Sequence, residues 1–146
     1  MFTERKRVQF NYPAIVTAAV ACCLLRAVWY SIFFETWLNG MGRNRAWFDG
    51  TGVSLILQFC TAFLAAVLLA AAISGFTQLT GLLTARRGAK VAAWLWLGLL
   101  LPTEATQSVF AVRTYEAFAL NAGFWLLGMA MIGAIVGGWK KGKGRE

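Results

Sequence analysis

The sequence predicts an all-α integral membrane protein, a four-helix bundle with four transmembrane helices and both termini on the cytoplasmic side. Hydrophobic residues make up 59% of the 146 residues and charged residues only 14%, against about 25% charged residues in an average soluble domain. A soluble domain of this length could not bury so much apolar surface inside itself. A lipid bilayer can accept that surface, so the composition predicts a membrane location.

Four apolar stretches supply the predicted helices. They cover about residues 12–34, 53–83, 89–112 and 117–139 of a single transmembrane domain, 1–146, which ends in a basic tail, 140–146. Each stretch exceeds the roughly 20 residues that a helix needs to cross the hydrocarbon core of a membrane. The third contains Pro102. Proline removes one backbone hydrogen bond from a helix, so we expect a kink at this point.

The basic residues predict the orientation of these helices. Three segments on one side of the predicted bundle hold ten Lys and Arg: Arg5, Lys6, Arg7, Arg86, Arg87, Lys90, Lys140, Lys141, Lys143 and Arg145. The opposite side holds three: Arg43, Arg45 and Arg113. Cytoplasmic segments of membrane proteins carry such an excess. Both termini are therefore expected to be cytoplasmic.

Charge and cysteine content exclude other classes of protein. The formal net charge of +8 could indicate a nucleic-acid partner. The basic residues, however, lie at the ends of apolar stretches, where orientation and attraction to anionic lipid headgroups explain them. We therefore expect the lipid bilayer as a partner, with anionic lipids at its cytoplasmic face, and we expect no nucleic-acid partner.

The chain has no His, and Cys22, Cys23 and Cys60 all fall in apolar stretches. No metal site and no cofactor is therefore expected.

Two charged residues fall inside the predicted membrane helices. Arg26 lies 13 residues beyond Pro13, and Glu104 lies 14 residues beyond Lys90. Both helices would run from the inside outwards, so at about 1.5 Å per residue both side chains would lie about 20 Å from the inner boundary. Ionisable residues are costly inside a membrane and indicate a functional site by default. The matched depths predict that Arg26 and Glu104 pair.

Further polar and aromatic residues are expected at the same level. Gln58 and Asn121 would lie near the outer ends of their helices, and Gln107 shares nearly one face with Glu104. The predicted cluster is Arg26, Gln58, Glu104, Gln107 and Asn121, walled by Trp29 and Tyr30. Two interpretations stay open. The cluster could bind an anionic or polar solute or a proton, because an Arg side chain suits carboxylate and phosphate, or it could be a structural ion pair that fixes helix register.

Gly133 and Gly137 form a GxxxG spacing in the fourth stretch. Small residues at this spacing let two helix backbones approach closely. The partner helix could belong to this chain or to another subunit, and the sequence leaves both open.

Two segments of the sequence carry a family resemblance. One is Arg26-Ala27-Val28-Trp29-Tyr30-Ser31, followed by Phe33-Phe34 and Trp37, and the other is Leu120 to Leu126, followed by Gly133-Ala134-Ile135 and Trp139. They resemble an uncharacterised family of small bacterial four-helix membrane proteins, domain of unknown function 1761. The resemblance extends over most of the chain. It implies a multi-pass protein of the bacterial cytoplasmic (inner) membrane, and it implies no activity or ligand.

For the function, the sequence predicts a non-enzymatic membrane protein. No Ser or Cys nucleophile lies beside a base and no carboxylates are paired, and most hydrolytic sites need one of these arrangements. We expect an accessory or structural subunit of a larger membrane assembly, with other membrane subunits or further copies of itself as partners. The alternative is a transporter-like or ligand-binding protein that uses the Arg26–Glu104 cluster for a small anionic or polar solute or a proton.

Overall fold

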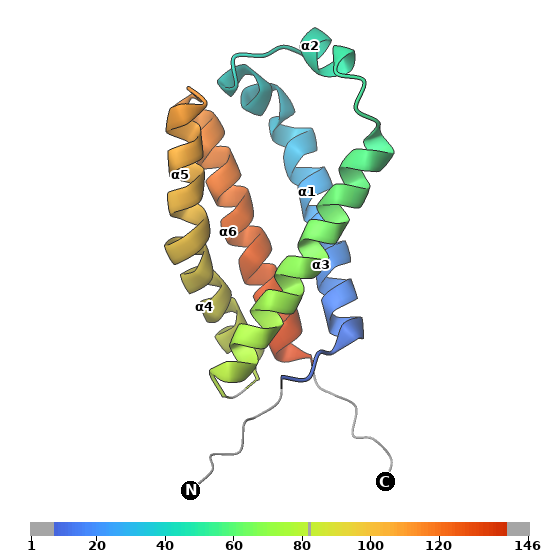
Figure 1. Cartoon of the computed structure of the whole chain (residues 1–146), viewed down its shortest axis with the longest axis vertical. Coiled ribbons are helices and arrows are strands. Elements are labelled where there is room, and N and C mark those ends of the chain that lie inside the picture. The colour runs from blue at the N-terminus through green and yellow to red at the C-terminus, as the bar shows by residue number, and fades with distance from the viewer. Residues whose placement is uncertain (1–7, 82, 140–146) are drawn as a thin grey trace, which may run out of the picture.

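The computed structural model describes residues 8–81 and 83–139, and all regular structure in these ranges is helical (Figure 1). The elements are α1 (Tyr12–Gly40), α2 (Arg45–Gly50), α3 (Leu55–Leu79), α4 (Ala85–Leu95), the π-helical segment η1 (Trp96–Leu100), α5 (Leu101–Phe110) and α6 (Tyr115–Gly138). The basic segment Arg5–Arg7 and the tail 140–146 lie outside the described residues.

Three helices are each long and apolar enough to cross a membrane: α1, α3 and α6. The sequence predicted four such helices. The remaining stretch, 89–112, is instead divided among α4, η1 and α5, which follow one another without a gap. The π turn ends just before Leu101 and Pro102. Pro102 has no N–H to donate to the carbonyl of Gly98, and a local π turn is one way in which a helix adapts to such a defect.

Side-chain caps explain where the helices begin. Asn11, Asn44, Ser54, Thr84 and Thr114 precede α1, α2, α3, α4 and α6, and each side chain accepts a hydrogen bond from the backbone N–H three residues later. These bonds satisfy N–H groups that have no partner within the first turn of a helix. The cap at Asn44 also accounts for α2, a six-residue helix within the expected loop 35–52.

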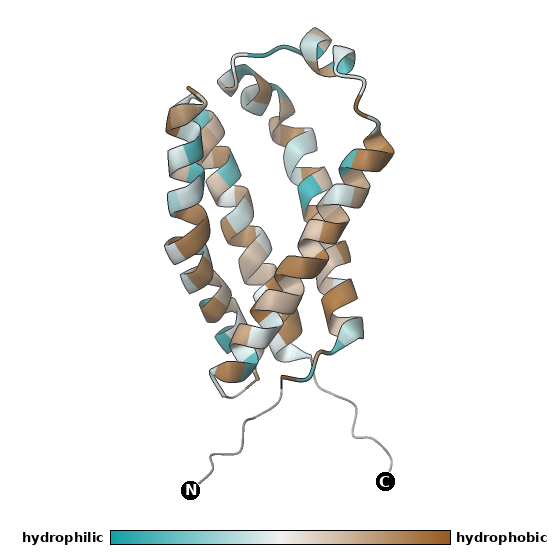
Figure 2. Ribbon diagram, viewed as in Figure 1, coloured by the Kyte–Doolittle hydropathy of each residue, from teal (hydrophilic) through white to brown (hydrophobic). Residues whose placement is uncertain are grey.

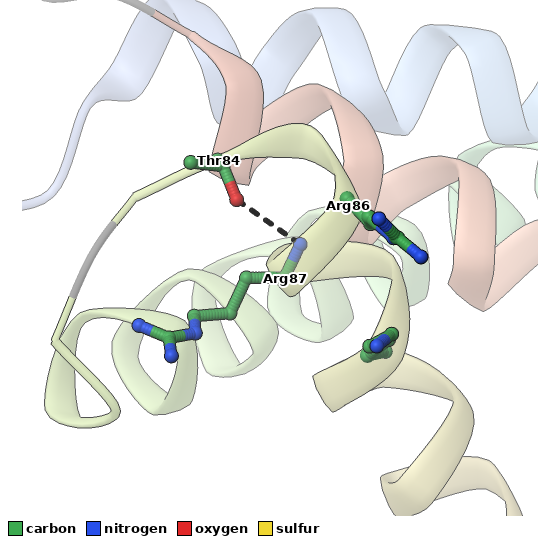
Figure 3. Close-up of a pocket in the computed structure, with 4 residues that line it drawn as sticks. Thr84, Arg86 and Arg87 are labelled. Atoms are coloured by element: carbon green, nitrogen blue, oxygen red, sulfur yellow. Dashed lines mark hydrogen bonds between the residues drawn. The ribbon is translucent and has the colours of Figure 1, made fainter.

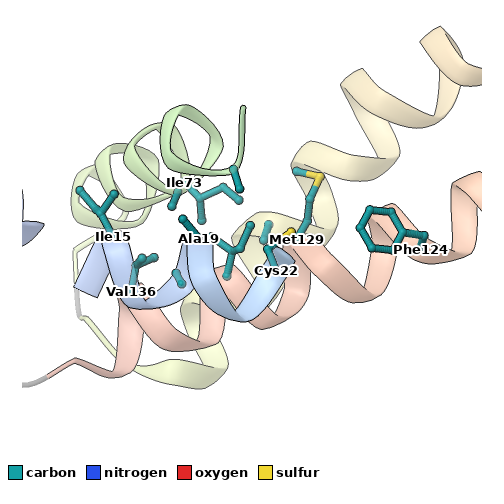
Figure 4. Close-up of a cluster of buried hydrophobic side chains, with 12 residues drawn as sticks. Ile15, Ala19, Cys22, Ile73, Phe124, Met129 and Val136 are labelled. Carbon is teal, nitrogen blue, oxygen red and sulfur yellow. The ribbon is translucent and has the colours of Figure 1, made fainter. Parts of the chain in front are cut away.

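The core lies at the end of the bundle opposite α2, where α6 packs against α1, α3 and α4 (Figure 4). Its buried residues are mostly small or aliphatic: Ile15, Ala18, Ala19, Cys22, Ala66, Ala70, Ile73, Ala92, Phe124, Met129, Ile132 and Val136. Towards α2, the helices α1 and α3 separate (Figure 1). Hydrophilic residues lie along the α1, α5 and α6 ribbons in this wider half, whereas most of the α3 ribbon is coloured apolar (Figure 2).

The closest approach between two helices joins α4 to α6. A Cβ atom added to Gly133 would meet the carbonyl oxygen of Gly88, and it would lie 2.7 Å from the Gly88 carbonyl carbon and 2.8 Å from the Ala92 Cβ. A Cβ atom added to Gly137 would lie 2.6 Å from the carbonyl oxygen of Thr84. Both glycines of the GxxxG spacing therefore lie against α4 of the same chain.

Replacing Gly133 with Ala should destabilise the bundle, because the new methyl group meets backbone atoms that cannot move independently. We expect a loss of about 1–3 kcal/mol, the usual range for overpacking, seen as a lower midpoint of thermal unfolding in detergent. Gly98→Ala is the matched control, because a Cβ atom at Gly98 meets nothing within 4 Å. Equal midpoints for the two variants would contradict the close contact between α4 and α6.

Candidate functional site

Tyr30 is at the centre of the polar groups in the wider half of the bundle. Its hydroxyl donates a hydrogen bond of 2.7 Å to Oδ1 of Asn121, a buried residue, and this bond joins α1 to α6. Its ring centroid also lies 5.8 Å from the guanidinium carbon of Arg26. The matched depth of Arg26 and Glu104 stays a prediction.

Glu104 pairs with Arg113 rather than with Arg26, the partner that the matched depths predict. The Glu104 Oε2 and Arg113 Nη1 atoms are 3.7 Å apart, and the two side chains are 23% and 25% exposed. Arg113 lies in the short turn between α5 and α6, where its backbone N–H donates to the carbonyl of Ser108. The turn thus brings Arg113 back over the last turns of α5, so it reaches Glu104 without crossing the bundle.

Arg26 contacts aromatic rings instead of a carboxylate. Its guanidinium carbon is 4.6 Å from the ring centroid of Phe124, 5.1 Å from that of Trp125 and 5.8 Å from that of Tyr30. The ion pairs formed among the described residues are Arg113–Glu104 and Arg45–Glu35, so no described acidic side chain neutralises Arg26. Ring faces attract a cation, but they leave its full charge in place.

Arg26 also lines a cleft of about 460 Å³ between α1 and α3, which we call the α1–α3 cleft. The residues that line it are Arg26, Ala27, Tyr30, Ser31, Phe34 and Trp37 from α1, Phe48 from α2, and Leu55, Gln58, Phe59 and Ala62 from α3. The cleft occupies the region where α1 and α3 diverge below α2 (Figure 1). Its size falls within the range of about 300–1,000 Å³ that is usual for small-molecule sites.

The other residues of the predicted cluster divide between this region and the outer surface. Gln58 lines the α1–α3 cleft, and its amide donates to the carbonyl of Val53 at 3.1 Å. Trp29 packs against Phe33 and Phe124, with ring centroids 5.0 and 6.5 Å apart. Gln107 is exposed and lies beside Thr103, Thr106 and Phe110, so it is separate from the cluster.

Sequence reasoning missed three residues of this region. Phe124 and Trp125 follow Asn121 by three and four positions, which places them on the Asn121 face of α6, and this spacing could have identified them. Arg113 was assigned only to the outer loop. The shortness of that loop, between Arg113 and Glu116, was the signal that it stays close to Glu104.

A second polar region lies at the opposite end of the bundle, at the start of α4 (Figure 3). Thr84, Arg86, Arg87 and Lys90 line a shallow pocket of about 440 Å³, and Oγ1 of Thr84 accepts a hydrogen bond of 3.2 Å from the backbone N–H of Arg87. The three cations are exposed and form no ion pair with a described residue. Anionic lipid headgroups suit such a surface, and this contact stays a prediction.

The thiols and carboxylates of the described residues do not gather into a metal-binding group. Within 8–81 and 83–139 there is no cluster of three or more His, Cys, Asp or Glu. Cys22, Cys23 and Cys60 are free, and they are buried, half-buried and exposed respectively.

Comparison with known proteins identifies one family. A family model described as "Protein of unknown function (DUF1761)" matches residues 13–137. No curated protein matches the chain significantly, and no solved structure does.

A pair of double-mutant cycles tests which arginine is coupled to Glu104. The cycle of Glu104→Gln with Arg113→Gln should give a coupling free energy of about 0.5–1 kcal/mol, because the two groups are in contact but partly exposed. The cycle of Glu104→Gln with Arg26→Gln should give a smaller value. Both are measured by thermal unfolding in detergent. A larger coupling free energy between Glu104 and Arg26 would contradict the Glu104–Arg113 pair and support the pair predicted from the sequence.

Proposed function

The chain belongs to the DUF1761 family of proteins of unknown function, and from that premise we propose that it is a membrane-embedded binding protein which holds an anionic molecule in the α1–α3 cleft. Arg26 is the group that binds the anion. No chemical conversion of the bound molecule is proposed.

The observation that carries this proposal is the uncompensated charge of Arg26 beside the cleft. A cation within a membrane is costly unless a partner or water satisfies it, and the described residues supply only ring faces. An anion in the cleft would supply the missing partner, with charge-assisted hydrogen bonds to the planar guanidinium. The aromatic rings below Arg26 would hold the guanidinium in place while the cleft is empty.

For the membrane arrangement, we propose that α4, η1 and α5 cross the bilayer together as a fourth span. Their 26 consecutive residues, 85–110, would extend about 39 Å at 1.5 Å per residue, enough to cross a hydrocarbon core of about 30 Å. The excess of Lys and Arg supports a cytoplasmic position for both termini and for the α3–α4 turn. In this orientation α2 and the α1–α3 cleft lie towards the outer face of a bacterial inner membrane.

The accessory-subunit function that the sequence predicts stays a second proposal. The exposed apolar side chains of α3, such as Ile56, Leu64 and Leu68, could contact either a neighbouring helix or lipid. They therefore do not favour a partner subunit over lipid. The cleft and the unpaired Arg26 favour the binding function. A stoichiometric larger protein that copurifies in mild detergent would instead support the subunit.

Reporter fusions test the four-span arrangement. Alkaline phosphatase, which is active only outside the cytoplasm, should be active when fused after Thr51 and inactive when fused after Gly81. Green fluorescent protein should give the reverse pattern, because it does not fluoresce when it is exported unfolded. If α4, η1 and α5 do not cross the bilayer, a fusion after Arg113 will report the same side as the fusion after Gly81.

Substitution of Arg26 tests the binding function. The protein purified from its native membrane in a neutral detergent should carry a bound small molecule in native mass spectrometry. Arg26→Gln removes the charge and leaves a shorter polar side chain, so the bound fraction should fall at least about tenfold, a change of about 1.4 kcal/mol.

Arg86→Gln is the control for this experiment, because it removes the same charge from the opposite end of the bundle. It should leave the bound fraction unchanged. Equal binding by wild type and Arg26→Gln, with both proteins folded, would exclude Arg26 as the anion-binding group.

A further inference from the structure

Three polar side chains that line the α1–α3 cleft each donate a hydrogen bond within the chain. The Ser31 hydroxyl donates to the carbonyl of Val28 at 2.8 Å, and the Gln58 amide donates to Val53. The Tyr30 hydroxyl donates to Asn121. The indole N–H of Trp37 is buried and has no partner among the described residues, and the Gln58 amide keeps a second N–H, whereas the guanidinium of Arg26 carries five. Arg26 is therefore the principal free donor in the cleft.

Aromatic and aliphatic side chains form the rest of the lining, among them Phe34, Phe48 and Phe59. A sugar, or another solute with many hydroxyl groups, would leave most of these groups without hydrogen-bond partners against such walls. Each such loss costs about 1–3 kcal/mol. The lining therefore fits a molecule with an apolar body and a single polar anchor.

No carboxylate lines the cleft. The nearby acidic residue on α1, Glu35, is paired with Arg45 at 2.9 Å. A ligand that carried a positive charge close to its anionic group would thus place that charge near Arg26 without a counter-ion. This charge pattern disfavours zwitterions such as amino acids and phosphocholine headgroups.

The α3 side of the cleft is open towards the surroundings of the bundle. Leu55 and Phe59 line the cleft and are nevertheless 65% and 52% exposed. In a membrane, hydrocarbon chains surround such side chains. A chain-bearing molecule could therefore move from the bilayer into the cleft between α1 and α3 without leaving an apolar environment.

From these observations, and resting on the proposed function, we infer that the ligand is a single-chain amphiphile with one anionic headgroup. The headgroup binds the Arg26 guanidinium, and the hydrocarbon chain lies along the aromatic wall between α1 and α3. The same chemistry is found in a fatty acid and in an alkyl phosphate, which differ in the headgroup alone.

Native mass spectrometry of the full-length protein in a neutral detergent tests this inference with five probes. Palmitate and hexadecyl phosphate carry the chain and one anionic group. Hexadecan-1-ol lacks the charge, hexadecylphosphocholine adds a positive charge, and butyrate lacks the long chain. We expect one-to-one adducts with palmitate or hexadecyl phosphate or both, and at least about tenfold less adduct with the other three. The stronger of the two anions identifies the headgroup as carboxylate or phosphate.

Two variants then locate the chain. Ala62→Phe, on the α3 wall, fills the cleft and should abolish the palmitate and hexadecyl phosphate adducts. If Ala62→Phe does not fold, Ala27→Leu on the α1 wall takes its place and should weaken the same adducts. Ala72→Phe is the matched control, because Ala72 is exposed on α3 and does not line the cleft. Thermal unfolding confirms that each variant is folded.

The outcomes separate this inference from the proposed function. Arg26-dependent binding of butyrate or hexadecylphosphocholine as strong as that of palmitate would overturn the ligand class and leave an anion site in place. Equal binding of hexadecan-1-ol and palmitate, or anion adducts that survive Arg26→Gln, would overturn the proposed function itself. Long-chain adducts that persist in a folded Ala62→Phe variant would overturn the placement of the chain.

Discussion

The contact between α4 and α6 is the constraint on which the rest of the structure depends. Gly88 on one helix and Gly133 and Gly137 on the other leave no side chain between the two backbones. In a membrane, helix association depends largely on close van der Waals packing of this kind. Alanine-rich faces of α1 and α3 then close the same end of the bundle around α6. Towards the other end, the aromatic residues Trp29 and Trp125, which contact the core residue Phe124, replace the small ones. The bundle therefore widens as its residues become larger, and the α1–α3 cleft lies in the wider half.

The same half holds Arg26, Glu104 and Arg113, two positive charges and one negative charge. Glu104 and Arg113 compensate each other at 3.7 Å, which leaves Arg26 with aromatic rings as its contacts. A bilayer increases the cost of such an imbalance, because lipid tails offer no hydrogen-bond acceptors. The cost falls when an anion approaches the guanidinium or when water enters the cleft. The unpaired charge and the cleft are thus complementary features, and either alone would be weaker support for a binding site.

Local properties of the sequence predicted the long helices, whereas properties that depend on rotation about a helix axis escaped prediction. The apolar stretches of α1, α3 and α6 are visible in hydropathy, and residue counting placed Arg26 and Glu104 at the same end of the bundle. Counting does not give direction around the axis, which changes by about 100° per residue. For this reason the sequence did not predict that Glu104 pairs with Arg113 instead of Arg26, or that Gln107 lies on the outer surface. The π turn before Pro102 and the six-residue α2 also escaped prediction, because each depends on a single local defect or cap.

Tyr30 fixes the aromatic surroundings of Arg26. Its hydroxyl donates to Oδ1 of Asn121, which ties the middle of α1 to α6. Its ring contacts Trp37 and Phe124, with centroids 5.5 and 5.6 Å apart, and these neighbours fix its position. The guanidinium of Arg26 lies over Phe124 and Trp125 of α6 and also lines the cleft, whereas Glu104 is paired with Arg113 of the α5–α6 turn. Among the described residues, Arg26 therefore keeps aromatic rings as its contacts, and the cleft is the open space beside its charge.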